Sequence, residues 1–503
     1  MNYPFWDTTT GYGLLMAAIA VVHVFVAHFA IGGGLYLVVT EHLARRAGDT
    51  ARLAYLAGLS RFFVLTTLVA GALTGVGIWF VIGLLNPAAT EALIRTFVWG
   101  WATEWTFFAV EIAAAILYYY GWKKMPAGPH LAIGWVYFVS AWLSLFIING
   151  ILTFMLTPGR WIEDGRFWSG FFNPTFWPSL MLRTGICVLL AGVYALLVAS
   201  RQRDAGFKAA LARYNAAWSL VGIAIVVPGF LWYWRAIPEP LMKAAADHLR
   251  TPFAAIQHGQ RLAAVAVVVL LLIALVLPRR LHIASVIVLM AMALGWFGSF
   301  EWFRESVRKP WIVHGVIYAN GIEASRIGKL QATGLLPSLR FRTGDDGGDL
   351  FRHACRSCHT ISGYKALKPA LSGTDPAFAG AIVKGLHLLR GQMPPFPGTA
   401  EEAELLGKWI YARVDQRPLA EVYSLQGTDL GRKVFDLRCA KCHVPGGVGD
   451  KTSSLAGLSA ADYGTMLDMA ADLGAGMPAF TGDTRDREAL IQYLTTIKQG
   501  GAK

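Results

Sequence analysis

Eight long apolar runs fill the first 310 residues of this 503-residue chain. In hydrocarbon every backbone N–H and C=O group needs a partner within the protein, so runs of this kind form membrane-spanning helices. The composition agrees, because 55% of the residues are apolar and only 15% are charged. We predict an all-α protein whose larger part is a polytopic transmembrane helix bundle of about eight spans. The predicted spans are residues 12–40, 54–85, 95–121, 131–156, 177–199, 215–234, 261–277 and 281–303.

The C-terminal third carries two copies of a Cys-x-x-Cys-His motif. In such a motif the two thiols bond to the vinyl groups of a haem, and the adjacent His becomes an axial ligand of the iron. A zinc site or a redox-active pair of cysteines is the alternative interpretation. The motifs predict two covalent haem c groups, attached at Cys355-Arg-Ser-Cys358-His359 and at Cys439-Ala-Lys-Cys442-His443.

The two motifs belong to a tandem repeat. A shift of 84 residues superimposes Gly347 on Gly431, Phe351 on Phe435, Phe396 on Phe480 and Trp409 on Tyr493. The same shift superimposes Met393 on Met477, and each Met lies 34 residues after the His of its motif. We therefore predict Met393 and Met477 as the second iron ligands. A thioether ligand raises the reduction potential, and six-coordinate iron suits electron transfer rather than oxygen chemistry.

Both repeats resemble class I cytochromes c, which end in a helix packed against the haem. Segments 401–414 and 485–498 fit that helix. After Trp311 the hydrophobicity falls and Gly, Pro and charged residues become more frequent, which indicates a linker. The predicted domains are a transmembrane domain at 1–311, a linker at 312–346, a first cytochrome c domain at 347–415 and a second at 416–503.

Basic residues predict the orientation of the bundle. The connections after spans one, three, five and seven are rich in Lys and Arg, whereas those after spans two and four hold few, so the former are expected in the cytoplasm. The basic connections hold Arg45, Arg46, Arg52, Lys123, Lys124, Arg201, Arg203, Lys208, Arg213, Arg279 and Arg280. We expect a multi-pass protein of the bacterial inner membrane, with its N-terminus and both cytochrome c domains in the periplasm, where haem c is attached.

The net charge of +13 mostly follows from this topology. No basic aromatic patch accompanies it, so we expect no nucleic-acid partner. The N-terminal residues lack the basic region that begins a cleavable signal peptide. Four of the five cysteines belong to the haem motifs, and Cys187 in span five is expected to be a small packing residue.

Ionisable side chains lie inside two of the spans, where each costs roughly 2.5 to 3.5 kcal/mol and needs a reason. Span one carries His23 and His28, and span three carries Glu104 and Glu111. The two glutamates share a helix face, whereas the two histidines diverge by about 140°. At 1.5 Å per residue, His23 and Glu104 lie about 17 and 14 Å below the outer surface, so we expect them to be neighbours.

The outer end of span eight resembles a motif of a known family. The segment Glu301-Trp-Phe-Arg-Glu305-Ser-Val-Arg308-Lys-Pro310-Trp311 resembles the Glu-x-Gly-Arg-Gln-Pro-Trp motif of subunit I of cytochrome bd quinol oxidases, with Val307 and Lys309 in place of Gly and Gln. Further stretches that look like this family are His23 with Gly32, Ala102-Thr-Glu104 through Glu111, Asn149-Gly150 and Asn173-Pro174. The resemblance covers about residues 10–311.

The resemblance implies two non-covalent membrane haems, of b or d type, at an oxygen-reducing site. It gives His23 and Glu305 the role of axial ligands, places Glu104 beside the haem pair and assigns Glu111 to a proton route. Arg308 belongs to the same catalytic motif. The alternative is that these side chains are structural polar contacts between helices. The resemblance also implies a membrane partner subunit, because cytochrome bd oxidases pair subunit I with a similar second subunit.

The sequence departs from the family pattern in the regions that, in the family, bind quinol and the haem next to it. Where the family has the His that holds its low-spin, quinol-proximal b haem, this chain has Arg183, which cannot ligate iron. The connection between spans six and seven, which holds the quinol-binding loop in the family, is only about 26 residues long here. His258, at the outer mouth of span seven, is a candidate ligand for a substitute haem. The last family span is absent, and the haem c units begin where it would lie.

These features favour a bd-like terminal oxidase that reduces O2 with electrons delivered through two periplasmic c haems. Its donor is expected to be a periplasmic c-type cytochrome or another soluble redox partner. The first alternative is a quinol:cytochrome c oxidoreductase that passes electrons from membrane quinol outward, with quinone as a further cofactor. The second is a non-catalytic haem subunit of a larger respiratory complex. An open coordination position on a membrane haem favours the oxidase, whereas two ligands on every iron favour either alternative.

Overall fold

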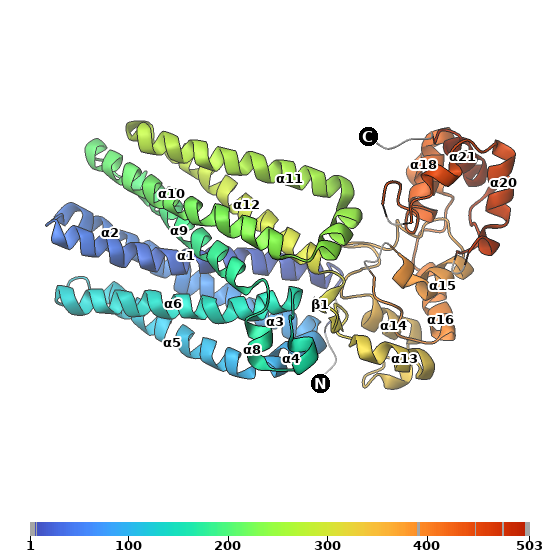
Figure 1. Cartoon of the computed structure of the whole chain (residues 1–503), viewed down its shortest axis with the longest axis horizontal. Helices are drawn as coiled ribbons and strands as arrows, with labels where there is room; N and C mark the ends of the chain where they lie inside the picture. The colour runs from blue at the N-terminus through green and yellow to red at the C-terminus, as the bar shows by residue number, and fades with distance from the viewer. Residues whose placement is uncertain (1–5, 7, 390–392, 448, 475–476, 498–503) are drawn as a thin grey trace.

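Helices form over all eight predicted spans (Figure 1). The computed structural model describes residues 6, 8–389, 393–447, 449–474 and 477–497, and the side chains of all of these except 247–254. The spans correspond to α1 (Tyr12–Arg46), to α2 (Thr50–Val64) with the π-helical turn η1 (Leu65–Gly71) and α3 (Ala72–Leu85), and to α5 (Val98–Gly121), α6 (Ala127–Leu156), α9 (Phe176–Ala199), α10 (Ala205–Ala236), α11 (Glu239–Val276) and α12 (Ile283–Arg308).

Seven of these helical runs, within the described residues, are long and apolar enough to cross a membrane. The remaining run, α5, carries Glu104 and Glu111 together with several Trp and Tyr side chains, which lowers its apolar character. It nevertheless runs along α6 through the bundle (Figure 1). The chain is therefore a multi-pass membrane protein.

Helix α9 forms the centre of the bundle, and most of its side chains are buried. Small residues let its neighbours approach closely, as is common between membrane helices. A Cβ added at Gly32 of α1 would lie 1.8 Å from the carbonyl oxygen of Cys187, and one at Gly222 of α10 would lie 2.3 Å from the nitrogen of Leu189. Cys187 is buried in this contact, which agrees with the predicted packing role.

The connection between the sixth and seventh spans differs from the prediction. We expected a stretch of about 26 residues between the helices. Instead α10 ends at Ala236 and α11 begins at Glu239, so that only Ile237 and Pro238 connect them. The apolar part of α11 starts at Ala255, and its first turns extend this helix beyond the membrane-spanning run.

The segment 312–346, predicted as a linker, is folded. It begins with a two-stranded antiparallel hairpin of β1 (Trp311–Val313) and β2 (Ile317–Tyr318). The turn η3 (Ala324–Arg326), helix α13 (Ile327–Thr333) and the turn η4 (Leu336–Ser338) follow. Leu330, Leu335 and Leu336 are buried in the core of the first cytochrome c domain, because the segment supplies one of its apolar faces.

The two cytochrome c domains are small helical units with separate cores, at the end of the bundle where the N-terminus also lies (Figure 1). The first contains α14 (Asp346–Ala354), α15 (Pro376–Lys384), η5 (Leu386–Leu388) and α16 (Ala400–Tyr411). The second contains α17 (Leu419–Tyr423), α18 (Gly427–Arg438), α19 (Thr452–Leu455), α20 (Ala460–Asp468), η6 (Ala470–Asp472) and α21 (Thr484–Leu494). Three short helices, α4 (Pro87–Thr96), α7 (Trp161–Asp164) and α8 (Phe167–Phe171), cover the same end of the bundle.

Candidate functional site

Each Cys-x-x-Cys-His motif folds into one turn that gathers its two thiols and its imidazole. Helices α14 and α18 end immediately before Cys355 and Cys439. The N–H groups of the second Cys and of the His then donate to the carbonyl oxygen of the first Cys, at 3.0 and 2.9 Å in the first motif and at 3.1 and 2.8 Å in the second. Burial raises the pKa of the Cys355 and Cys439 thiols to about 12.

The motif histidines are held in the same way in both repeats. His359 Nδ1 lies 3.1 Å from the carbonyl oxygen of Lys365, and His443 Nδ1 lies 3.0 Å from that of Gly449. A carbonyl can only accept, so Nδ1 carries the proton and Nε2 keeps its lone pair for a metal. Burial also lowers the pKa of His359, which favours the neutral, ligating ring. These turns fit covalent haem c.

In each repeat, the closing helix and the helix before the Cys-x-x-Cys-His motif cross each other, and a glycine lies at the crossing point. A Cβ added at Gly347 would lie 2.4 Å from the Trp409 side chain, and one at Gly431 would lie 1.8 Å from the carbonyl oxygen of Ala489. Beside each crossing an aromatic pair is in contact. The ring centroids are 5.3 Å apart for Phe351 and Trp409 and 5.5 Å apart for Phe435 and Tyr493. The repeat predicted from a shift of 84 residues is therefore a structural repeat.

Met393 and Met477 are both partly buried and lie in irregular segments between the last two helices of their domains. Their role as second iron ligands stays a prediction. The predicted closing helices are observed as α16 and α21, although residue 498 at the end of the second prediction lies outside the described residues. Among the residues that the structure describes, no group of three or more His, Cys, Asp or Glu side chains could hold a metal ion.

His23 in α1 shows the same pattern as the two haem c histidines. Its Nδ1 lies 3.1 Å from the hydroxyl oxygen of Thr74 in α3, and that hydroxyl donates its own proton to the carbonyl oxygen of Ala70 at 2.7 Å. His23 is therefore the donor in the His23–Thr74 bond, which leaves its Nε2 for a metal. The π-helical turn η1 directly precedes this stretch, and such turns are frequent at functional sites.

His28, in contrast, has both ring nitrogens engaged. Its Nδ1 lies 2.8 Å from the carbonyl oxygen of Val24, and its Nε2 lies 3.4 Å from a guanidinium nitrogen of Arg183. Arg183 in turn forms a buried ion pair of 2.8 Å with Glu301, which also binds Arg304 at 2.9 Å. Sequence reasoning missed this cluster, although a single Arg in an apolar span required a counter-charge and Glu301 was available in the last span.

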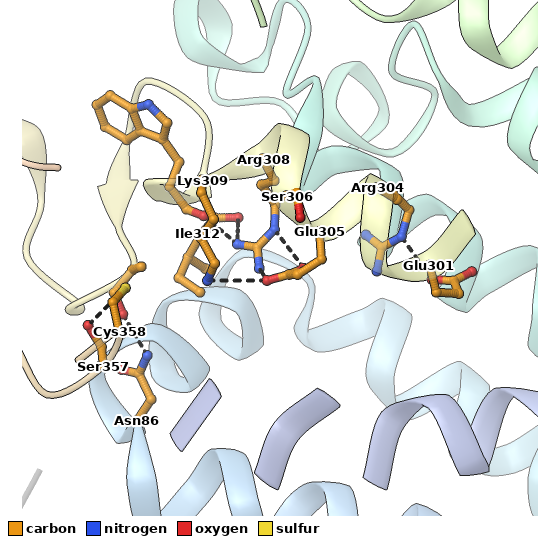
Figure 2. A network of polar contacts seen from close by, with 12 residues as sticks. Asn86, Glu301, Arg304, Glu305, Ser306, Arg308, Lys309, Ile312, Ser357 and Cys358 are labelled. Atoms are coloured by element: carbon orange, nitrogen blue, oxygen red, sulfur yellow. Dashed lines mark hydrogen bonds and ion pairs between the residues drawn. The ribbon is translucent and has the colours of Figure 1, made fainter. Parts of the chain in front are cut away.

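Glu305 lies one turn further along α12, within a group of cations (Figure 2). Its carboxylate pairs with Arg308 and, at 3.3 Å, with Lys309, and its side chain remains 39% exposed. Arg308 is buried and also donates to the carbonyl oxygens of Trp311 and Ile312, at 2.5 and 2.9 Å. Arg308 bonds both carboxylate oxygens of Glu305, so Glu305 is part of an ion-pair cluster, and its role as a haem ligand stays a prediction.

The two glutamates of α5 face α6. Glu104 accepts a hydrogen bond from Ser144 at 2.9 Å, and Glu111 accepts one from Tyr137 at 3.0 Å. His23 bonds Thr74 and Glu104 bonds Ser144, and the expectation that His23 and Glu104 are neighbours stays a prediction. His258 is exposed on α11, and its role as a haem ligand stays a prediction.

The β1–β2 hairpin joins the Glu305 segment to the first haem motif (Figure 2). Immediately after the hairpin, the carbonyl oxygen of Ala319 accepts from the side chain of Asn86 at 2.8 Å, and Asn320 donates to the carbonyl oxygen of Ala354 at 3.4 Å. Asn86 directly follows α3, and Ala354 directly precedes the Cys355 motif. One short hairpin therefore fixes the distance between the end of the bundle and the first haem motif.

Arg356, inside the first haem motif, makes a second contact with the bundle. It is buried, and its guanidinium donates to the carbonyl oxygen of Leu85 at 3.0 Å. Leu85 is the last residue of α3, where helix carbonyls carry partial negative charge and need donors. The N-terminal segment packs on the same loop, since a Cβ added at Gly11 would lie 2.9 Å from Thr360.

The second cytochrome c domain packs on the first. The Arg438 guanidinium donates to the carbonyl oxygen of Ser372, and the Tyr423 hydroxyl donates to that of Pro369 at 3.0 Å. The first haem motif contacts the bundle through Arg356, and the residue before Cys355 contacts Asn320 in the segment that follows the β1–β2 hairpin. The position of the second repeat that corresponds to Arg356 is occupied by Ala440.

A membrane-spanning helix bundle with two haem-attachment turns at one end defines a respiratory haem electron-transfer protein. Residues 14–234 match the family model of cytochrome bd terminal oxidase subunit I. Residues 342–410 and 426–494 each match that of cytochrome c oxidase, cbb3-type, subunit III. The chain therefore joins a cytochrome bd oxidase subunit I-like membrane domain to two cytochrome c domains, as predicted. The Glu305 segment lies beyond the first match.

Among solved structures, the bd oxidase from Geobacillus thermodenitrificans has a similar fold, with a TM-score of 0.53. The two sequences are 15% identical, and the similarity covers 60% of this chain and 88% of that one. No curated protein matches the chain.

Proposed function

We propose that this protein is a bd-like oxygen reductase that receives its electrons through the two cytochrome c domains. The observation that carries the proposal is the junction of the first haem motif with the bundle. Arg356 and the β1–β2 hairpin hold that motif at the end of α3 and α12, beside Glu305. Electrons that arrive at the first cytochrome c domain thus approach the membrane site from a fixed position.

The proposed roles follow from the chemistry of each side chain. When bound, the haem groups supply one-electron transfer and, in the membrane, oxygen binding. Cys355 and Cys358 with His359, and their counterparts in the second repeat, hold the covalent groups, with Met393 and Met477 as the second ligands. His23 and Glu305 hold the two membrane groups, oriented by Thr74 and Arg308. Glu104 and Glu111 hold and pass protons.

The contacts between domains support a serial route. The first cytochrome c domain contacts the bundle through its haem motif, and the second packs on the first. We propose that a soluble redox partner, such as a periplasmic c-type cytochrome, exchanges electrons with the second domain, which passes them to the first. A membrane partner subunit is proposed by analogy with the bd oxidases alone.

The charge pattern supports the periplasmic orientation that this route needs. The turns that join α1 to α2, α5 to α6 and α9 to α10 carry Arg45, Arg46, Arg52, Lys123, Lys124, Arg201 and Arg203, and they lie at the end opposite the cytochrome c domains (Figure 1). Basic connections of this kind stay in the cytoplasm. The cytochrome c domains are therefore proposed to face the periplasm of a bacterial inner membrane.

Two features of the region where the bd family binds quinol also support electron entry through the cytochrome c domains. The Arg183–Glu301 ion pair lies where the resemblance to the bd family expects a haem-ligating His. The two-residue turn between α10 and α11 leaves no long loop at the expected quinol site. Both features favour electron entry through the cytochrome c domains.

Oxygen uptake tests the proposal. A reduced soluble cytochrome or an artificial donor is expected to drive oxygen uptake by the purified protein without quinol, and carbon monoxide is expected to perturb the spectrum of a membrane haem. A protein that ignores oxygen and carbon monoxide, yet reduces its c haems when given quinol, would instead be a quinol:cytochrome c oxidoreductase. A protein that does neither would be a non-catalytic subunit.

A further inference from the structure

A buried ionic pair lies at the end of the bundle that is remote from the cytochrome c domains. Glu41 of α1 and His130 of α6 are both fully buried, and the carboxylate oxygen lies 2.8 Å from His130 Nδ1. Tyr118 of α5 donates its hydroxyl to the same carboxylate at 2.7 Å, and Arg45 donates at 2.6 Å. The side chain of Arg45 is 26% exposed, so it connects this pair with the surface.

The hydrogen bonds of His130 require a proton between it and Glu41. His130 Nε2 lies 2.9 Å from the carbonyl oxygen of Tyr118, which can only accept, so Nε2 carries a hydrogen. A bare Nδ1 would then direct its lone pair at a carboxylate oxygen. The contact is favourable only when one proton lies between the two groups, and Arg45 favours its residence on His130 Nδ1. The pair therefore stores one transferable proton.

Two further polar contacts continue from this pair along the α5–α6 interface. Three residues of α5, spaced seven apart, contact three residues of α6 that are also spaced seven apart. The two helices are antiparallel, so the numbers fall along α5 as they rise along α6. The three pairs are Tyr118 with His130, Glu111 with Tyr137, and Glu104 with Ser144. Seven residues are nearly two helical turns, so the pairs lie on one face and about 10.5 Å apart.

Tyr118 and Tyr137 shorten the step between the first and the second pair. The ring of Tyr118 reaches Gly134, one turn inward from His130, where an added Cβ would lie 2.9 Å from it. The ring of Tyr137 reaches Gly34 of α1, where an added Cβ would lie 2.3 Å from it. Side chains lean towards the N-terminus of their helix, and these two helices are antiparallel, so the two rings lean towards each other. Ser140, buried on α6, lies between the other two pairs.

We infer that Glu41 and His130 form the proton-loading site for the route that is proposed above for Glu111 and Glu104. This inference rests on the proposed function, which supplies the reaction that consumes protons. A proton leaves His130 Nδ1 for Glu41, passes through intervening water to Glu111 and then to Glu104. A replacement proton then reaches Glu41 from solvent beside the partly exposed Arg45 side chain and passes back to His130 Nδ1, so no charge accumulates. Chains of Asp, Glu and His of this kind are used as proton relays in membranes.

Proton uptake in sealed vesicles tests the inference. The full-length protein is reconstituted with its cytochrome c domains outward and a pH-sensitive dye inside, and is then reduced by a soluble donor under argon. Uptake of protons from the vesicle interior is expected to accompany reduction of the membrane haems. In Glu41→Gln, His130→Gln and Tyr137→Phe this uptake is expected to slow at least about tenfold, because each change removes a proton-transfer group.

The tyrosine variants keep the test decisive if a charge substitution prevents folding. Tyr137→Phe removes one hydroxyl at constant shape, and Tyr36→Phe is its matched control, because Tyr36 is equally buried but donates to Asn215 at 2.6 Å, away from the three pairs. The control is expected to take up protons at the original rate. Unchanged uptake in Tyr137→Phe and His130→Gln, or uptake from the outer side, would overturn the inference. Proton uptake is measured in the absence of oxygen. A protein that takes up protons as expected but fails to reduce oxygen would therefore contradict the proposed function and not this inference.

Discussion

At the scale of single residues, these histidines fall into two groups according to the hydrogen bonds of their ring nitrogens. His23, His359 and His443 each have Nδ1 bonded to a neighbouring oxygen, and within the described residues no protein group bonds their Nε2. In His28 and His130 both nitrogens have partners. A ligating His needs its second nitrogen anchored to fix the tautomer, so the first group is equipped for iron. Thr74 supplies this anchor for His23.

Replacing Thr74 by Val is expected to weaken binding of a membrane haem about 10- to 100-fold, the usual effect of losing such an anchor. His23→Ala is expected to remove that haem and to leave both c haems reducible by a soluble donor. The measurement is the non-covalent haem content per covalent haem, before and after washing with a haem-binding protein. Thr67→Val is the matched control, because Thr67 is buried seven residues earlier, in η1, and its hydroxyl donates to the carbonyl oxygen of Phe63. Full haem content in Thr74→Val would remove Thr74 from the site.

At the scale of elements, the two cytochrome c units depend on the approach of one helix to another. In the second unit α18 and α21 meet at Gly431, where an added Cβ would lie 1.8 Å from a backbone carbonyl oxygen. A backbone atom cannot move aside as a side chain does, so the crossing requires glycine.

Gly431→Ala is therefore expected to destabilise the second unit by about 1 to 3 kcal/mol, the usual cost of overpacking. Denaturant titration that follows the Met–iron absorption of each c haem is expected to show earlier loss in the second unit, with the first unit as an internal reference. Gly328→Ala in α13 is the control, because a Cβ added there meets no atom within 4 Å. Simultaneous loss in both units at the original midpoint would contradict this role of the crossing.

The helices also show which parts of the fold could be predicted from the sequence. Apolar runs predicted the eight helices, and the 84-residue shift predicted the tandem repeat, because both signals are local or periodic. The helix crossings at Gly347 and Gly431 became visible only in the structure. The fold of segment 312–346 was missed, since its three buried leucines form an apolar face only against the first cytochrome c core. The Glu41–His130 pair and the Arg183–Glu301 pair were missed for the same reason. Each joins residues far apart in the chain, and only the packing of helices brings them together.

At the scale of the whole molecule, the first cytochrome c domain is the connection between the bundle and the second. Arg356 lies inside its haem motif and binds the end of α3, so the same turn that holds a haem also holds the domain in place. The second motif has Ala440 at the corresponding position, which shows that a motif in this chain accommodates Ala there.

Arg356→Ala is expected to slow electron exchange between the c haems and the membrane haems by about tenfold or more, the effect of losing one hydrogen bond from a charged donor at the junction. Covalent haem content, both c-haem potentials and reduction by a soluble donor are expected to stay unchanged. Rapid-mixing spectroscopy resolves these steps, and Arg356→Lys is expected to restore part of the rate because it keeps a charged donor. Exchange at the original rate in Arg356→Ala, with both haems present, would show that this contact does not position the domain.

The Glu41–His130 pair and the cytochrome c domains lie at opposite ends of the bundle (Figure 1). In an enzyme that works as proposed, electrons enter from one side of the membrane and the protons that meet them enter from the other. Each turnover then separates charge across the bilayer without any pumping device. The membrane potential opposes this movement by about 2.3 kcal/mol per elementary charge and 100 mV. Respiration through this protein would therefore both build the voltage and slow down as the voltage rises.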